Sequence, residues 1–266
     1  MKVDETKEQL ICENVSFSWD SRLGQAQPAL TNISFKVEKG EFVSILGPSG
    51  CGKTTLLYLL SGLKRPYAGK ILLNGQIIQG PTQLVGIVFQ EHNLFPWLTV
   101  QKNIEFGMKM LAFDQDARSD RSEEILRKVG LWNKRHRFPR ELSGGMKQRV
   151  AIARVLAYES PFILMDEPFA SLDYQTRLKM QEFLLEMWEE FHRTIIFVTH
   201  QVDEALHLSD QILLMSSGPG QISEKHHIDV SRPRDLMSDK LNKLRGYVFS
   251  HLKREVDLKF ESELEE

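Results

Sequence analysis

A glycine-rich stretch of the sequence has the spacing of a loop that binds phosphate groups. The stretch follows an apolar run, Phe42–Leu46, and leads into Thr54–Ser61, whose residues favour a helix that ends at Gly62. Glycines allow several backbone N–H groups to point toward phosphate oxygens, and the N-terminus of a helix adds a favourable potential for an anion. We therefore expect a phosphate site in the loop Gly47-Pro48-Ser49-Gly50-Cys51-Gly52-Lys53-Thr54.

Three side chains at the end of this loop predict how ATP would be held. The ammonium group of Lys53 is placed to reach the β- and γ-phosphates, and the hydroxyl of Thr54 is placed to bind Mg²⁺. Thr55 is expected to support the α-phosphate. The sequence thus predicts ATP and Mg²⁺ as ligands.

Two adjacent carboxylates end another apolar run. Asp166 and Glu167 directly follow Phe162–Met165, a predicted strand, so they would lie at the carboxyl edge of a sheet, where ligands bind in α/β folds. Asp166 can hold Mg²⁺ through water there, whereas Glu167 points elsewhere and can accept a proton from an attacking water. The alternative is a solvated pair of strand-end carboxylates, and the phosphate loop favours the catalytic interpretation.

The composition is that of an ordinary globular protein. Of 266 residues, 41% are apolar and 26% charged, and 34 basic against 36 acidic side chains leave a formal net charge of −2. This balance provides no global basic field for nucleic acid or anionic lipid. A disulfide between Cys12 and Cys51 would disrupt the phosphate loop, which favours a reducing cytosol. The sequence shows no signal peptide and no apolar run near the ~20 residues that span a bilayer, so we expect another chain to hold it at any membrane.

The order of predicted elements indicates an α/β fold: a P-loop NTPase core with a parallel-strand sheet, an N-terminal antiparallel β annex and a helical insertion. We expect a single ATPase domain over residues 1–240, with core and annex in 1–90 and 159–225, the insertion in 91–158, and a charged helical tail over 226–266. The predicted strands are Leu10–Trp19, Thr31–Val37, Phe42–Leu46, Lys70–Ile78 with an Asn74-Gly75 hairpin turn, Leu84–Phe89, Phe162–Met165, Thr194–Thr199 and Gln211–Ser216, and the predicted helices include Ser122–Val129, Thr176–Phe191 and Asp203–Leu208.

A third motif lies between the loop and the carboxylates. The stretch Leu142-Ser143-Gly144-Gly145-Met146 resembles the signature motif of ATP-binding cassette (ABC) ATPases. Three more elements match that family in order: Gln90 resembles the Q-loop glutamine, Ser171-Leu172-Asp173 the D-loop, and His200 the switch histidine. The chain is therefore similar to an ABC-transporter ATP-binding subunit across roughly residues 10–240.

The resemblance implies roles for these residues. Gln90 would sense Mg²⁺ and the γ-phosphate and couple the core to the helical insertion, while His200 would contact the γ-phosphate. The signature cannot reach its own chain's nucleotide, so Ser143, Gly144 and Gly145 would cap the γ-phosphate held by a second ABC ATPase subunit, identical or different. Two chains would thus sandwich two ATP molecules. At the end of the signature, Met146 stands where the family more commonly has glutamine. This difference affects the expected contact with the ribose and leaves the expected phosphate cap unchanged.

Five of the residues have competing interpretations. Trp19 falls where the family places an aromatic that stacks on adenine; Phe17 competes with it for that role, and core packing is the alternative for both. A histidine such as His200 could also form only a local hydrogen bond. The pair His226-His227 lacks further metal ligands nearby, which favours a solvated pair.

Several segments resemble importers of the nitrate/sulfonate/taurine type, a group that also includes transporters of bicarbonate and vitamin precursors. Such a subunit would sit at the cytoplasmic face of the membrane, bound to integral-membrane permease subunits and linked indirectly to an extracytoplasmic solute-binding protein, with no nucleic-acid partner. The sequence leaves the cargo open. The segments are 93–100, 142–149, 166–169, 217–220 and 231–235.

The stretch Phe95-Pro96-Trp97 follows the Q-loop and is rich in bulky apolar residues. It can line a groove for a short helix of a partner, or it can pack the interior of the helical insertion. These two interpretations predict opposite exposures for Trp97.

Two non-transport functions use the same ATPase. DNA-repair and chromosome-organising ATPases insert long coiled coils between the Q-loop and the signature, but only about fifty residues separate Gln90 from Leu142. Translation-type factors carry two cassettes in one chain, and this sequence has one. Transport is therefore the favoured interpretation.

Overall fold

The computed structural model describes residues 9–19 and 28–264, with side chains described up to residue 257. The chain forms two compact units. The first contains Met1–Thr82 and His192–Glu266, and the second contains Gln83–Phe191.

The first unit contains an antiparallel sheet with strand order β2-β1-β4-β5. Asn74 and Gly75 join β4 to β5 with φ values of 52° and 77°, the left-handed conformation that tight hairpin turns need. The predicted β annex and its turn are therefore present. The strands are β1 (Gln9–Phe17), β2 (Leu30–Glu38), β4 (Ala68–Leu73) and β5 (Gln76–Ile77).

A second group of strands in this unit surrounds β3 (Phe42–Leu46), every residue of which is buried. β3 pairs in parallel with β8 (Thr194–Thr199) and β9 (Gln211–Ser216). Continuous apolar strands are expected where both faces of a parallel sheet are covered. The helices α1 (Lys53–Leu60) and α6 (Val202–Leu208) follow β3 and β8 along the chain.

Strand β10 (Gln221–His227) pairs antiparallel with β9 and includes the first two residues of the predicted helical tail. His226 contacts Glu224 at 2.8 Å and His227 contacts Gln211 at 3.0 Å. Among the described residues, no cluster of histidine, cysteine and acidic side chains is suited to a metal ion. No residue of β10 is fully buried, so the histidine pair lies on a surface strand.

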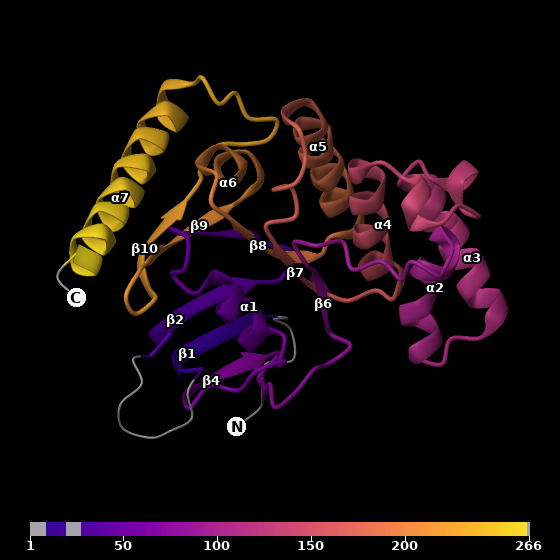
Figure 1. Ribbon diagram of the computed structural model, residues 1–266, viewed down its shortest axis with the longest axis horizontal. Helices are drawn as coiled ribbons and strands as arrows, with labels where there is room; N and C mark the ends of the chain where they lie inside the picture. The colour runs from indigo at the N-terminus through magenta and orange to yellow at the C-terminus, as the bar shows by residue number, and fades with distance from the viewer. Residues whose placement is uncertain (1–8, 20–27, 265–266) are drawn as a thin grey trace. The chain divides into compact units, whose positions relative to one another are not determined.

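The C-terminal helix α7 (Asp239–Leu264) lies alongside β9 and β10 in the first unit, drawn in yellow in Figure 1. Leu241 and Val248 are buried in a hydrophobic cluster with residues of β3, α6 and β9. The predicted helical tail is therefore a helix from Asp239 onward, and this helix packs on the first unit.

The second unit contains the predicted helical insertion. Thr99, Asp114 and Ser143 cap three of its helices through side-chain oxygens that accept a backbone N–H. The predicted helix Ser122–Val129 is the second half of α3, which begins earlier because Asp114 caps it. The elements are β6 (Val85–Val88), α2 (Val100–Met110), α3 (Gln115–Lys128), η1 (Trp132–Lys134), η2 (Pro139–Glu141), α4 (Gly144–Ala157), β7 (Phe162–Asp166) and α5 (Tyr174–Phe191).

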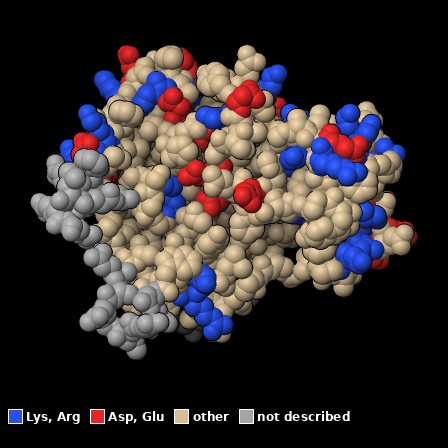
Figure 2. Space-filling view, viewed as in Figure 1, with Lys and Arg blue, Asp and Glu red and all other residues tan. Residues whose placement is uncertain are grey.

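Charged side chains of both signs lie interspersed on the face shown in Figure 2. This distribution matches the small net charge of −2. Within the described ranges, no helix has the length and apolarity that a bilayer crossing requires.

Candidate nucleotide-binding site

The candidate site residues are divided between the two units. The glycine-rich loop, His200 and Trp19 belong to the first unit, whereas Gln90, Asp166, Glu167 and Ser143–Gly145 belong to the second.

In the first unit, the loop after β3 curls through glycines that no other residue can easily replace. Gly50 and Gly52 have φ values of 80° and 99°, and Gly52 is the N-cap of α1. A Cβ on Gly47 would lie 2.6 Å from the Cys51 sulfur, and one on Gly52 would lie 2.6 Å from Leu30 Cδ2. The loop therefore approaches its surroundings too closely for side chains, and its backbone N–H groups gather at the start of α1.

Lys53 is the first residue of α1 and is only 6% exposed. Its ammonium group donates hydrogen bonds to the carbonyls of Gly47 at 2.8 Å and Pro48 at 2.9 Å. An ammonium has three N–H donors, so these two bonds hold the charge over the loop while another donor can reach a phosphate oxygen.

The other loop residues divide into exposed and buried positions. Ser49, Gly50 and Thr54 are exposed, so they are accessible to a ligand. Cys51 and Thr55 are buried, at 1% and 8% exposure, and pack beneath the loop.

His200 is exposed in the turn between β8 and α6. The neighbouring Thr199 hydroxyl donates to the buried Glu204 carboxylate at 2.5 Å and accepts from the Gln201 N–H at 3.0 Å. These bonds fix the turn that carries His200. Neither Thr199 nor Glu204 belongs to a sequence motif, so their support of this turn could not be predicted from the sequence.

The exposures of the two candidate adenine-stacking residues differ. Phe17 is 6% exposed and packs in the core, whereas Trp19 is 55% exposed. The Trp19 ring meets Phe17 edge-on at 5.1 Å, and Lys64 Nζ lies 5.1 Å from its centroid. Of the two, only Trp19 therefore presents a large aromatic surface to solvent, and its role toward adenine stays a prediction.

In the second unit, β6 and β7 place Gln90 at the same end of a sheet as Asp166 and Glu167, although Gln90 is far from both in the sequence. The strands are parallel, with Val88 opposite Met165, so Gln90 lies just beyond the same end as Asp166 and Glu167. Asp166 is 7% exposed, and Glu167 has a φ of 42°, an uncommon conformation outside glycine. The chain therefore turns sharply where the candidate base is located.

The signature residues form the N-terminus of α4. Ser143 is the N-cap, and its hydroxyl accepts from the Met146 N–H at 3.4 Å. Ser143 and Gly144 are exposed, and Gly145 is half-buried. A helix start of this kind offers unpaired N–H groups and a positive potential to an anion.

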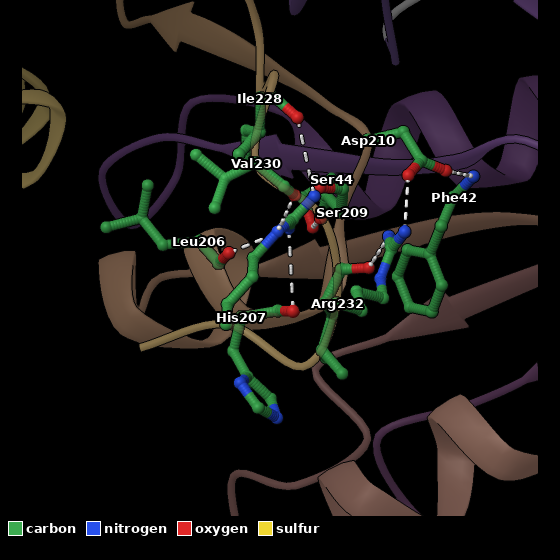
Figure 3. Close-up of polar contacts among 11 residues, drawn as sticks. Phe42, Ser44, Leu206, His207, Ser209, Asp210, Ile228, Val230 and Arg232 are labelled. Atoms are coloured by element: carbon green, nitrogen blue, oxygen red, sulfur yellow. Dashed lines mark hydrogen bonds and ion pairs between the residues drawn. The ribbon is translucent and has the colours of Figure 1, made fainter. Parts of the chain in front are cut away.

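The segment after β10 holds the other end of α6, as drawn in Figure 3. The Arg234 guanidinium donates to the carbonyls of Leu206 at 2.8 Å and Ser209 at 2.6 Å. Arg232 donates to Asp210 at 2.6 Å, and the Asp210 carboxylate accepts from the Phe42 N–H at 2.9 Å. The two arginines thus link the helix after His200 to the first residue of β3.

The fold and these motifs define a P-loop nucleotide-binding protein. Residues 30–170 match the ABC transporter family, and the chain belongs to that family. The predicted resemblance and the predicted P-loop α/β fold are both confirmed.

The chain is similar to ATP-binding proteins over most of its length. It is 44% identical to an uncharacterised ABC transporter ATP-binding protein of Methanocaldococcus jannaschii, over 96% of this chain and 95% of the relative. It is 44% identical to an aliphatic sulfonates import ATP-binding protein of Bacillus thuringiensis, over 88% and 92% of the two chains. It is also 44% identical to a nitrate import ATP-binding protein of Synechocystis, over 82% of each chain.

A solved structure supports the same architecture. The dimeric, post-hydrolysis structure of an ATP-binding cassette bound to ADP and Pi matches with a TM-score of 0.72 and 31% identity, covering 84% of this chain and 100% of that one.

Proposed function

We propose that the chain is the ATP-hydrolysing subunit of an ABC importer for a small solute. The observation that carries the proposal is a pair of helix starts that are suited to bind phosphate. One is α1, which follows the glycine loop and Lys53, and the other is α4, which is capped by Ser143 and begins with two glycines. A phosphate held between two such helix starts would be neutralised from both sides.

In this proposal two subunits bind two ATP molecules head to tail. Each site would combine the loop, Asp166, Glu167, Gln90 and His200 of one chain with Ser143–Gly145 of the other. Glu167 would accept the proton of the attacking water, and Lys53 and His200 would stabilise charge on the γ-phosphate. Trp19 would stack on the adenine ring. Hydrolysis would release the γ-phosphate, whose charge both chains neutralise in the closed dimer, so the dimer would reopen.

The residues present suit Mg²⁺. The exposed Thr54 hydroxyl would bind it directly and the Asp166 carboxylate would bind it through water. Few protein ligands are needed because Mg²⁺ keeps several waters and takes oxygen atoms from phosphate. The bound cation would neutralise charge on the phosphates.

The second unit provides a surface for a permease. Trp97 is 70% exposed, so it is a surface residue rather than part of the insertion's interior. It lines a groove of about 390 Å³ together with the apolar residues Leu98, Phe106 and Met110 and with five polar or charged residues of α2 and α3. Apolar side chains around a groove suit a short helix of a partner protein.

The shape of this surface depends on a buried amide. Asn103 is 0% exposed, and its Nδ2 donates to the carbonyls of Phe95 at 3.1 Å and Leu98 at 3.0 Å, while its Oδ1 accepts from the Phe95 N–H at 2.8 Å. Asn103 thereby holds the Phe95–Leu98 segment in the conformation that exposes Trp97.

The relatives support a proposal for the class of cargo and for the location of the subunit. The sulfonate and nitrate import ATP-binding proteins support a small organic or inorganic anion, or a related small solute, as the cargo. The subunit would lie at the cytoplasmic face of the membrane, bound to permease subunits and served by an extracytoplasmic solute-binding protein. The comparisons favour neither DNA repair nor translation.

Replacing the candidate base tests the chemistry. Glu167→Gln should slow ATP hydrolysis by roughly 10²–10⁴-fold, because it removes the proton acceptor. ATP binding should persist, and ATP should now hold the variant as a dimer in size-exclusion chromatography. Glu186→Gln, an exposed change on α5, is the matched control. Hydrolysis by Glu167→Gln near the wild-type rate would contradict the assignment.

A second experiment tests whether the site forms between chains. Lys53→Ala should weaken nucleotide binding by the monomer, whereas Ser143→Arg should leave that binding intact and block turnover. If sites are composite, a mixture of the two inactive variants can form one complete site in each heterodimer. An equal loss of monomer ATP affinity in both variants would contradict the role of Ser143 toward a partner.

A further inference from the structure

A cavity of about 670 Å³ lies beside the phosphate loop in the first unit. Its lining includes Gly47 and Pro48 of the loop, His200, and the α7 residues Phe249 and Val256. These two apolar side chains are 62% and 50% exposed. The C-terminal helix therefore presents apolar surface next to the candidate γ-phosphate site.

Other contacts fix α7 in this position. Leu241 and Val248 bury one stripe of the helix in the core, at 1% and 0% exposure. The Tyr247 hydroxyl donates to Glu224 at 2.9 Å, and Arg245 pairs with Asp203 at 2.7 Å. Phe249 and Val256 are one heptad apart, so they share a stripe of the helix surface. Because Phe249 directly follows the buried Val248, that stripe is rotated by about 100° from the core-facing one. Packing of α7 on its own unit thus leaves this second stripe exposed.

An exposed aromatic residue, Tyr174, lies beside the signature in the second unit. Tyr174 begins α5 and is 71% exposed. Its neighbours two positions away contact the signature: a Cβ on Gly144 would lie 3.4 Å from Leu172 Cδ2, and one on Gly145 would lie 2.9 Å from Thr176 Cγ2. Tyr174 and the signature therefore belong to one local surface.

We propose that Tyr174 of the partner subunit enters the cavity beside the phosphate loop and packs against Phe249 and Val256. This inference rests on the proposed function, in which the signature of one copy approaches the loop and His200 of the other. A movement that places Ser143 on the γ-phosphate also brings the adjoining Tyr174 to the side chains around His200. The occupant is therefore a second copy of this chain.

The chemistry of the cavity suits a tyrosine. Phe249, Leu252 and Val256 offer apolar contact to the ring, and Arg245 and Lys253, which also line the cavity, offer polar partners to the phenol. Tyrosine favours surfaces of this mixed kind because one end of its side chain is apolar and the other forms hydrogen bonds. The contact would make α7 a second anchor of the closed dimer.

Disulfide cross-linking tests the contact in the full-length chain. Tyr174→Cys in one chain and Phe249→Cys in a differently tagged chain, both with Glu167→Gln, should form a cross-linked heterodimer under mild oxidation with ATP and not without it. Cys12 and Cys51 are buried and form no disulfide, so they contribute little background. Met237→Cys, at a position 73% exposed and outside the cavity, replaces Phe249→Cys in the control and should give no cross-link.

Phe249→Asp provides an independent measurement. It should raise the dissociation constant of the ATP-held dimer by roughly thirtyfold, the effect of losing a 2 kcal/mol interface anchor. The melting temperature and ATP affinity of the monomer should change little, because Phe249 is 62% exposed. Met237→Asp is the matched control. Tyr174→Ala should weaken the dimer similarly, and combining it with Phe249→Asp should cost less than the sum of the two changes.

The outcomes separate this inference from the function on which it rests. An ATP-held dimer that forms without the 174–249 cross-link, and that tolerates Phe249→Asp, would overturn the inference and leave the function intact. Loss of permease association by Phe249→Asp with an unchanged dimer would overturn it in favour of a permease contact. If ATP never dimerises the Glu167→Gln chain, the proposed function itself fails.

Discussion

Gly145 of the signature and Thr176 of α5 pack so closely that a Cβ added to Gly145 would lie 2.9 Å from Thr176 Cγ2. The signature helix start is thereby held against the helix that follows the D-loop. The two glycines of α4 serve two purposes: they leave the N–H groups accessible, and they allow this packing.

The contact predicts a specific rescue. Gly145→Ala should lower ATP turnover at least tenfold, because α4 must shift to relieve the clash and the phosphate cap moves with it. Thr176→Ser removes the clashing methyl and keeps the hydroxyl, so the double variant should recover part of the lost turnover. Thr176→Ser alone, the control, should behave like the wild type. If the double variant is as slow as Gly145→Ala, the added methyl acts on the nucleotide rather than on Thr176.

The buried arginine of the segment before α7 should be important for stability. Arg234 is 8% exposed and donates to carbonyls at the end of α6, and burial lowers the pKa of its guanidinium to about 10, so it remains charged at neutral pH. Arg234→Met leaves those carbonyls unpaired and should cost about 3 kcal/mol or more in the free energy of unfolding. Denaturant unfolding measures the change.

Two further variants define the cause of that loss. Arg254→Met removes an exposed arginine of α7 and should change stability by less than about 0.5 kcal/mol. Arg234→Lys keeps the charge but not the planar fork of donors, so it should be intermediate. Full stability in Arg234→Lys would show that charge alone matters.

Residues whose chemistry demands a fixed local spacing could be predicted from the sequence. The glycine loop with Lys53, and the Asp166-Glu167 pair after an apolar strand, are of this kind. Residues that act on backbone groups far along the chain could not. Arg234 binds carbonyls of α6, and carbonyls have no sequence signature. Strand β10 was also missed, because it is a surface strand with no fully buried residue and therefore lacks an apolar pattern.

A histidine beside the signature predicts a dependence on pH. Burial lowers the pKa of His92 from 6.5, the charge of Lys147 lowers it further, and a hydrogen bond to the Gly144 backbone opposes them. A lowered pKa means that the unfolded chain binds a proton more readily. The contribution of His92 to stability is therefore complete above about pH 6.5 and is lost as the pH falls below it.

Comparison of two histidine variants isolates this effect. His92→Gln should lessen the decrease in unfolding free energy between pH 7.5 and pH 5.5, because the titrating group is gone. His136→Gln, at an exposed position in the same unit, should keep the wild-type decrease. Identical pH profiles for His92→Gln and the wild type would show that other groups dominate the acid sensitivity.

The exposed tryptophan near the Q-loop predicts a partner-specific defect. Trp97→Ala should lower the affinity for the permease by about thirtyfold or more, which corresponds to about 2 kcal/mol of binding free energy, because exposed aromatic side chains are frequent interface anchors. Co-purification with the permease should fall accordingly. The melting temperature of the variant should stay close to that of the wild type, since a side chain 70% exposed contributes little to the core.

Asn103→Ala should give both a lower permease affinity and a lower melting temperature, because it releases the carbonyls of Phe95 and Leu98 inside the fold. Tyr67→Ala, at another exposed aromatic in the first unit, is the matched control and should give neither. Pull-down and thermal unfolding on the same preparations separate these results. A large loss of melting temperature in Trp97→Ala alone would show that this residue packs the insertion and would remove it from the docking surface.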